Sequence, residues 1–283
     1  MSLGRASPRG FALAAVALAA WPAITALLAS VPLARALAPP IAGQPAGDAA
    51  YFELGALFLL DVLPPIAREL RAPALRGLAL VLGLSVLALA PFAVALTALS
   101  APGASPRALF ARARRHLGTL ALVWLAGLVA RAAVVALGLV AGRLVGHDLG
   151  WGPPRGDVAL AAGLALGVAA AWLVGLVADL ASVACVDRGL RFYEAMQTGL
   201  ARAWSGLAAR ASRSSLAAAS FALAAALLPD VQRRAGGAAG VAWLVAAFAA
   251  TSLCRVSWLE RARAIAARDA DDAHDADETT MLA

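Results

Sequence analysis

The sequence has few charged residues: Asp, Glu, Lys and Arg make up 14% of its 283 residues. An ordinary soluble domain carries about 25% charged and about 45–50% apolar residues. Here 62% of the residues are hydrophobic and the mean hydropathy is +0.79. These values exclude a single soluble globular domain. They also exclude intrinsic disorder, because chains that cannot collapse contain few apolar side chains and many charges.

Cysteine, histidine and lysine are scarce or absent. The two cysteines, Cys185 and Cys254, are isolated, so no disulfide framework is predicted. The three histidines lie far apart in the sequence, and none has a second ligand at metal-binding spacing. All 24 basic residues are arginine. Together with abundant alanine and glycine, this usage indicates a GC-rich, bacterial coding sequence.

Motifs that carry catalytic or nucleotide chemistry are also missing. The sequence contains no GxxxxGK[ST], HExxH or GxSxG, and no GxGxxG that opens a helix after a strand. We therefore assign no catalytic, cofactor-binding or metal-binding residue and expect a protein that is not an enzyme. A pI near 11.0 in a soluble protein would indicate nucleic-acid binding. Here the arginines lie between apolar runs, which favours membrane topology and no nucleic-acid partner.

What the sequence does contain is long apolar runs. A hydrocarbon core of about 30 Å requires roughly 20 apolar residues in a helix. We predict six spans, with a single transmembrane domain over residues 1–268. They lie at about residues 11–31, 76–98, 118–142, 158–180, 212–228 and 238–257. Period-two alternation is absent, so the spans are helices and not barrel strands.

Two details qualify the first and fifth spans. The run 11–31 is longer than the apolar region of a signal peptide, about 7–15 residues, so an uncleaved helix is favoured although residues 36–38 resemble a cleavage site. The run 212–228 is short, is followed by Pro229, which would end a helix, and can be extended backward through Leu207.

Arginine placement sets the orientation. With the N-terminus inside, fifteen arginines fall in cytoplasmic segments and eight in outer segments, and Arg131 lies within a span. The positive-inside rule therefore predicts a multi-pass protein of the cytoplasmic (inner) membrane with both termini in the cytoplasm. The cluster within residues 112–115, between the second and third spans, contributes most to this prediction.

Two segments are neither spans nor simple loops. Residues 48–63 are too short to span and predict a helix on the outer side, with Asp48 as N-cap and Pro64-Pro65 as its end; a surface lid, a re-entrant helix and a gate are open alternatives. Residues 187–211 predict an amphipathic elbow helix on the cytoplasmic side. Its candidate contacts with interfacial lipid and anionic headgroups are Arg188, Arg191, Arg202, Phe192, Met196 and Trp204. Packing beneath the bundle is the alternative.

Two charged side chains in the spans are the candidate solute-binding or packing residues. Arg131 lies roughly 20 Å from the cytoplasmic end of the third span, and an intramembrane charge indicates a functional site by default. Snorkelling or a structural salt bridge would also accommodate it. Asp179 lies near the inner end of the fourth span, roughly 10 Å from Arg131 in depth, and we expect a nearby arginine or interfacial water to neutralise it.

Small residues recur every four positions in two spans. In the fourth span, Gly163, Gly167 and Gly175 predict close helix packing. The glycines at 138, 142 and 146 carry less weight, because the abundance of alanine and glycine produces such spacings by chance. Beyond the last span, residues 269–283 form an acidic tail that we predict to be disordered.

The order of elements resembles a loose group of six-span bacterial membrane proteins. The run from Asp179 to Gly189, followed by the amphipathic segment, is similar to one in the membrane domains attached to some glycerophosphodiester phosphodiesterases. In that group a basic residue often follows the aspartate, and here Ser182 stands in its place. The resemblance implies the fold and transfers no catalytic residue, because the hydrolase part is absent.

These observations predict an all-α, polytopic transmembrane bundle. The expected function is a non-enzymatic scaffold, accessory or envelope-homeostasis component with the lipid bilayer and an unidentified membrane protein as partners. The alternative is a small-solute or lipid transporter or channel that uses Arg131 and Asp179.

Overall fold

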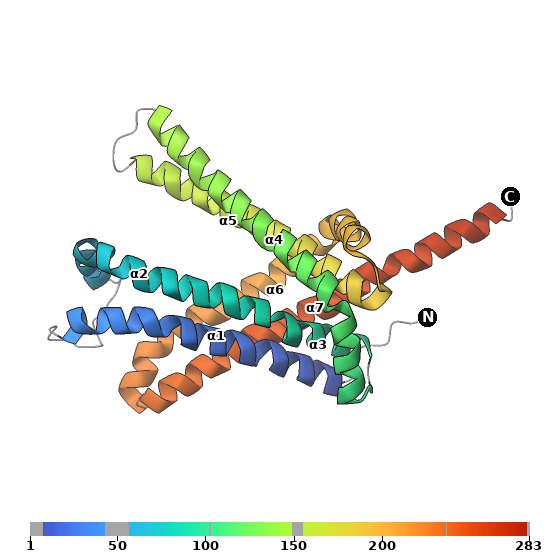
Figure 1. Cartoon of the computed structure of the whole chain (residues 1–283), viewed down its shortest axis with the longest axis horizontal. Helices are drawn as coiled ribbons and strands as arrows, with labels where there is room; N and C mark the ends of the chain where they lie inside the picture. Colours follow the sequence, from blue (N-terminus) through green and yellow to red (C-terminus); the bar gives the residue numbers. More distant parts are fainter. Residues whose placement is uncertain (1–7, 43–56, 102, 149–154, 236, 282–283) are drawn as a thin grey trace. The chain divides into compact units, whose positions relative to one another are not determined.

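The computed structural model describes residues 8–42, 57–101, 103–148, 155–235 and 237–281. These residues form seven α-helices and no strand (Figure 1). In chain order they are α1 (Pro8–Ala42), α2 (Leu57–Leu87), α3 (Leu89–Ser100), α4 (Pro106–Asp148), α5 (Arg155–Arg188), α6 (Phe192–Ala235) and α7 (Gly237–Met281).

Six segments of these helices are long and apolar enough to cross a membrane. They are Pro8–Thr25, Arg71–Ser100, Pro106–Asp148, Arg155–Arg188, Phe192–Leu228 and Ala242–Ala267. Each overlaps one of the six spans predicted from the sequence, so the prediction of an all-helical, multi-span membrane protein is confirmed. In lipid, a helix satisfies its backbone hydrogen bonds within itself, which is why long apolar runs adopt it.

Proline produces the break inside the second span. Helix α2 ends at Leu87 and α3 begins at Leu89, although the amide nitrogens of Ala88 and Phe92 still donate to the carbonyl oxygens four residues earlier. Pro91 has no N–H and cannot donate to the carbonyl of Leu87. The two helices therefore form one candidate span, Arg71–Ser100, with a local interruption.

The predicted outer helix, residues 48–63, is corrected in part. Residues 48–56 lie outside the described residues, and 57–63 form the beginning of α2, which continues through Pro64-Pro65. Pro64 and Pro65 therefore do not end a separate short helix. Proline costs a hydrogen bond and crowds the carbonyl four residues earlier, but its fixed φ is helical, so the chain can stay helical on both sides.

The predicted elbow is also different. Residues 187 and 188 end α5, Gly189 adopts φ +67° in the connection, and α6 then runs without interruption from Phe192 through the fifth span to Ala235, past Pro229. The elbow and the fifth span are thus parts of one helix. Nothing between residues 192 and 228 stops it, because the segment contains no proline.

The acidic tail is helical in the structure as far as Met281, where disorder was predicted. The segment 269–281 contains no glycine or proline, which would disfavour a helix. Four of its residues are alanine or methionine, which favour one. The helix of the last span can therefore propagate into it without a costly new nucleus.

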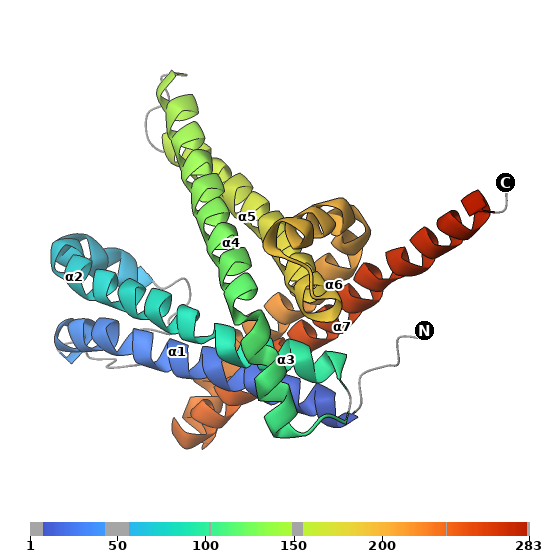
Figure 2. The ribbon, with the colours of Figure 1, turned by 45° about the vertical axis from the view of Figure 1, so that its right-hand side comes forward.

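The chain divides into two compact units. The first consists of Met1–Phe11, Leu96–Arg213 and Ser257–Ala283, and the second of Ala12–Ala95 and Ser214–Val256. In the first unit α4 and α5 form a long antiparallel hairpin, and the two helices lie side by side in both views (Figures 1 and 2). In the second, α1 lies beside α2, and the indole Nε1 of Trp21 donates to the carbonyl oxygen of Leu84 at 2.9 Å.

The core of the first unit lies around the C-terminal part of α5. Every residue from Ala178 to Val186 is buried there. Six large apolar side chains from other helices of this unit are also fully buried: Leu96, Leu99, Leu120, Val123, Trp258 and Leu259. The candidate site is built on this segment.

Candidate functional site

The site is a cluster of charged and aromatic side chains around Asp179 on α5. The Asp179 side chain is 5% exposed, so its carboxylate needs partners in place of water. Its Oδ2 accepts hydrogen bonds from Nη1 of Arg210 on α6 and, at 2.9 Å, from Nε1 of Trp258 on α7. One carboxylate oxygen thus ties three helices together.

The guanidinium of Arg210 lies over two indole rings. Its guanidinium carbon is 5.3 Å from the centroid of the Trp172 ring and 5.6 Å from that of Trp258. Its side chain is 10% exposed, and tryptophan is the aromatic residue that best attracts a desolvated cation. The two rings and the carboxylate of Asp179 together replace the hydration of the guanidinium.

Gly175 makes room for Arg210 and for a second arginine. A Cβ at Gly175 would lie 2.8 Å from Nη2 of Arg210 and 3.0 Å from Nη2 of Arg131 on α4. Both guanidinium groups therefore reach the same point on α5, one helical turn before Asp179. Any side chain at position 175 would displace them. Gly175, which the sequence analysis assigned to helix packing, borders the two arginines in the structure.

Arg131 differs from Arg210 in its partners. It is half-buried, its Nε is shielded from solvent, and this atom has no hydrogen-bond partner. No carboxylate among the described residues pairs with it. The Asp179 carboxylate already bonds to Arg210 and Trp258. Two guanidinium groups and one carboxylate leave the cluster with one excess positive charge.

A second ion pair lies two turns farther along α5. Nε of Arg263 on α7 donates to Oδ2 of Asp187 at 2.8 Å, and Oδ1 accepts from the hydroxyl of Ser100 at the end of α3. Nη1 of Arg263 also donates to the carbonyl oxygen of Leu99. Both side chains are mostly buried, at 10% and 15% exposure. This cluster joins the end of α3 to α5 and α7.

Small residues on α6 bring Arg210 to Asp179. A Cβ at Gly199 would lie 2.5 Å from the carbonyl oxygen of Val177, and one at Gly206 would lie 3.2 Å from the side chains of Leu176 and Trp258. Ala195 is buried on the same side of the helix. This stripe of small residues sets the close approach of α6 to α5.

The other sides of this part of α6 are exposed. Tyr193, Leu200 and Trp204 are exposed to 69%, 70% and 84%, and at 100° per residue they share one face. Of the predicted lipid contacts, Phe192, Met196 and Arg202 are half-buried, and Arg188, Arg191 and Trp204 are exposed. The amide nitrogen of Arg191 donates to Oε2 of Glu194, which caps the helix start.

Glycines also form the interface between α4 and α5. A Cβ at Gly163 would lie 2.3 Å from the carbonyl oxygen of Gly138, and one at Gly142 would lie 2.6 Å from that of Ala159. Gly167 faces the backbone of Val134 and Val135. The structure thus joins the glycines of both helices, including those of α4 that the sequence analysis weighted less.

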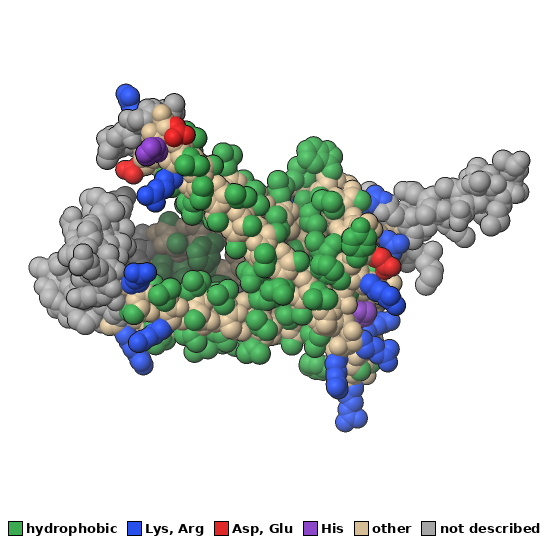
Figure 3. Space-filling view, turned by 45° about the horizontal axis from the view of Figure 1, so that its top comes forward, with side chains coloured by type: hydrophobic (Ala, Val, Ile, Leu, Met, Phe, Trp, Pro, Cys, Tyr) green, Lys and Arg blue, Asp and Glu red, His purple; other side chains and the backbone are tan. Residues whose placement is uncertain are grey.

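Apart from Arg131 and Asp179, the charged side chains of the α4–α5 hairpin lie near its two ends, and the face seen in Figure 3 is apolar between them. At the beginning of α4 lie the arginines at 107, 112, 114 and 115, and at the far end lie Arg143, Asp148, Arg155 and Asp157. This distribution is typical of a hairpin whose middle lies in hydrocarbon and whose ends lie at the two membrane surfaces.

Sequence reasoning placed two of the cluster's charges, Arg131 and Asp179, and separated them by roughly 10 Å in depth. The structure brings Arg131 beside Gly175, four residues or roughly 6 Å along the helix from Asp179. Arg210 and Trp258 were missed. Two features of the sequence could have indicated Arg210. A carboxylate within a span requires a partner, and Arg210 lies on the same helix face as the small residues Ala195, Gly199 and Gly206.

In the described part of the chain, no group of three or more His, Cys, Asp or Glu residues is arranged to hold a metal ion. Comparison of the chain with protein-family models, with curated proteins and with solved structures finds no match.

Proposed function

We propose that this multi-span membrane protein is a non-enzymatic scaffold or accessory subunit, and that Arg131 is its docking point for a carboxylate on a transmembrane helix of a partner. The observation that carries the proposal is the excess charge of the cluster: Arg131 lies beside a second guanidinium and has no carboxylate partner among the described residues. Arg131 is half-buried with its Nε shielded from water, and a charge that loses water without gaining a counter-charge is destabilised.

The depth of Arg131 favours a carboxylate from protein over a phosphate from lipid. Along α4, Arg131 lies roughly 24 Å from Arg115 and roughly 18 Å from Arg143. A hydrocarbon core about 30 Å thick places its middle about 15 Å from either surface. An arginine side chain snorkels over only part of that distance, whereas a side chain on a neighbouring transmembrane helix can lie at any depth.

A second copy of this chain is not the expected partner. Among the acids in the described candidate spans, Asp179 lies farthest from a span end. Its carboxylate bonds to Arg210 and Trp258, so a copy would have to break its own cluster to reach Arg131. The partner is therefore a different protein with an aspartate or glutamate inside a span.

The same cluster supports one alternative, an anion transporter or channel. Arg131, Arg210 and Gly175 would bind the anion and Asp179 would limit its affinity. Broken helices near the midplane are typical of transporters. In this chain, the interruption between α2 and α3, at Ala88, belongs to the other compact unit and not to the unit that contains the cluster, so we rank the alternative second.

The test compares Arg131→Gln with Arg143→Gln in the full-length chain. Arg143 lies on the same helix and is exposed near its end, so it controls for the loss of one positive charge. Each tagged variant is purified from native membranes in polymer-bounded discs, and co-purifying membrane proteins are quantified by mass spectrometry. We expect a stoichiometric partner with an acid in a span to be retained by Arg143→Gln and reduced at least about tenfold by Arg131→Gln.

A charge exchange completes the test. Arg131→Glu combined with arginine at the partner's acidic position should restore association. Equal recovery of the partner with Arg131→Gln and wild type contradicts the docking role of Arg131. Flux of chloride or inorganic phosphate into proteoliposomes of the purified chain, lost in Arg131→Gln and kept in Arg143→Gln, would establish the transporter alternative in its place.

A further inference from the structure

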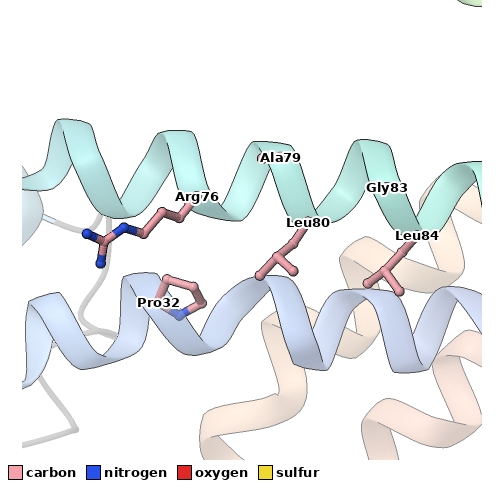
Figure 4. Close-up of a pocket in the computed structure, with 6 residues that line it drawn as sticks. All are labelled: Pro32, Arg76, Ala79, Leu80, Gly83 and Leu84. Carbon is pink, nitrogen blue, oxygen red and sulfur yellow. The ribbon is translucent and has the colours of Figure 1, made fainter.

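A groove with an apolar lining runs between α1 and α2. Its volume is about 560 Å³, and its lining is apolar except at one residue (Figure 4). It is lined by Pro32 of α1 and by Arg76, Ala79, Leu80, Gly83 and Leu84 of α2. All six residues belong to the second compact unit. The bond from Trp21 to the Leu84 carbonyl fixes the two helices at one end of the groove.

The groove lies on a surface that faces hydrocarbon. Arg76 and Leu80 belong to the candidate span Arg71–Ser100, and Leu80 is 41% exposed. The neighbouring side chains Leu78, Val81 and Leu82 are exposed as well. Water does not fill an apolar groove within a bilayer core. Flexible apolar chains of the surrounding lipid are the occupants that can enter it.

Arg76 gives the groove a polar end. Its guanidinium extends from α2 toward α1, near Pro32 (Figure 4). Arg76 lies five residues inside the end of its 30-residue candidate span, roughly 7 Å along the helix. The span is about 15 Å longer than a hydrocarbon core of about 30 Å, so this position falls at the boundary between hydrocarbon and headgroups, from which an arginine side chain can extend to a lipid phosphate.

We propose that this groove is a binding site for one glycerophospholipid, with an acyl chain along Leu80, Gly83 and Leu84 and the phosphate on the guanidinium of Arg76. The apolar floor matches the chain, and the single cation at its end matches an anionic headgroup at the same depth. The inference is independent of the partner proposed for Arg131, because it rests on other residues in the other compact unit.

The two parts of the site can be tested separately. Arg76→Gln removes the cation and keeps the groove. Gly83→Leu adds a side chain to the groove lining at an open position, because a Cβ at Gly83 would meet no neighbouring element within 4 Å. Two matched controls exist: Arg71→Gln removes an exposed arginine that does not line the groove, and Gly118→Leu adds the same side chain at an open position of α4.

The full-length chain is delipidated in detergent and titrated with phosphatidylglycerol, phosphatidylethanolamine or diacylglycerol of the same chains, and bound lipid is counted by native mass spectrometry. We expect Arg76→Gln to bind both phospholipids about fivefold more weakly and diacylglycerol unchanged. Gly83→Leu should weaken all three lipids, and both controls should bind as wild type. Wild-type binding by Arg76→Gln and Gly83→Leu, or an equal loss in Arg71→Gln, overturns the proposal.

Discussion

Asp179 shows how much a single buried carboxylate can organise. Its pair with Arg210 and its bond to Trp258 connect α5, α6 and α7, and two indole rings lie within cation–π distance of the Arg210 guanidinium. Desolvation makes such a pair only a modest source of net stability, but the loss of one partner leaves an uncompensated charge. Replacing Asp179 alone, and Asp179 together with Arg210, therefore distinguishes the loss of the pair from the cost of an uncompensated charge.

Asp179→Asn keeps the shape of the side chain and leaves Arg210 without a counter-charge. We expect a loss of about 3–5 kcal/mol in the free energy of unfolding, measured by denaturant titration of the purified protein in micelles. The double variant Asp179→Asn/Arg210→Gln should recover most of this loss, because no buried charge remains. Asp157→Asn, an exposed acid at the start of the same helix, is the control. An Asp179→Asn variant as stable as this control would contradict the structural role of the pair.

At the scale of the elements, glycine decides which helices meet. Gly138 and Gly163 bring the backbones of α4 and α5 so close that a Cβ on either would overlap a carbonyl oxygen of the other. Such contact gives dispersion energy that lipid cannot supply, since lipid tails are as apolar as the helices. Backbone atoms cannot move aside as a flexible side chain does, so these contacts tolerate no added carbon.

Gly163→Ala should force α4 and α5 apart. A Cβ there would lie 2.3 Å from the carbonyl oxygen of Gly138, and the strain should lower the free energy of unfolding by about 1–3 kcal/mol. Gly118→Ala, at an open position of α4, should have little effect or stabilise the helix by up to about 1 kcal/mol. Denaturant titration in micelles measures both. Equal stability of the two variants would mean that the backbones do not pack in this way.

At the scale of the whole molecule, α4 is long and apolar enough to place its two ends on opposite sides of a membrane. The arginines at 107–115 are dense at the start of this helix, and the positive-inside rule predicts that end in the cytoplasm. This orientation would place both termini in the cytoplasm and Arg76, with the groove between α1 and α2, on the outer side.

Cysteine labelling tests the orientation. In a background with Cys185 and Cys254 replaced by alanine, Phe110→Cys and His147→Cys place single thiols at exposed positions near the two ends of α4. A membrane-impermeant maleimide should label His147→Cys in intact cells and Phe110→Cys only after permeabilisation. Labelling of Phe110→Cys in intact cells would reverse the predicted topology.

The sequence by itself determined the number and nature of the spans. Transfer of an apolar helix into lipid depends on the composition of that helix alone. Six long apolar runs in a sequence that is 62% hydrophobic therefore suffice to place six candidate spans. Helix bounds were less predictable, because proline at 64, 65 and 229 weakens a helix without ending it. Asp179 and Arg131 stood out for the same local reason, a charge in an apolar run.

Only the tertiary structure decided which helices pack together and which of their side chains meet. Apolar residues surround α5 on all sides, so its sequence marks no face for α4, α6 or α7. The pairing of Asp179 with Arg210, 31 residues away, and with Trp258, 79 residues away, depends on helix rotation and glycine contacts that are not local. Packing likewise decides the surroundings of Arg131 and Arg76. Arg131 has no carboxylate partner among the described residues, and Arg76 lines the end of an apolar groove.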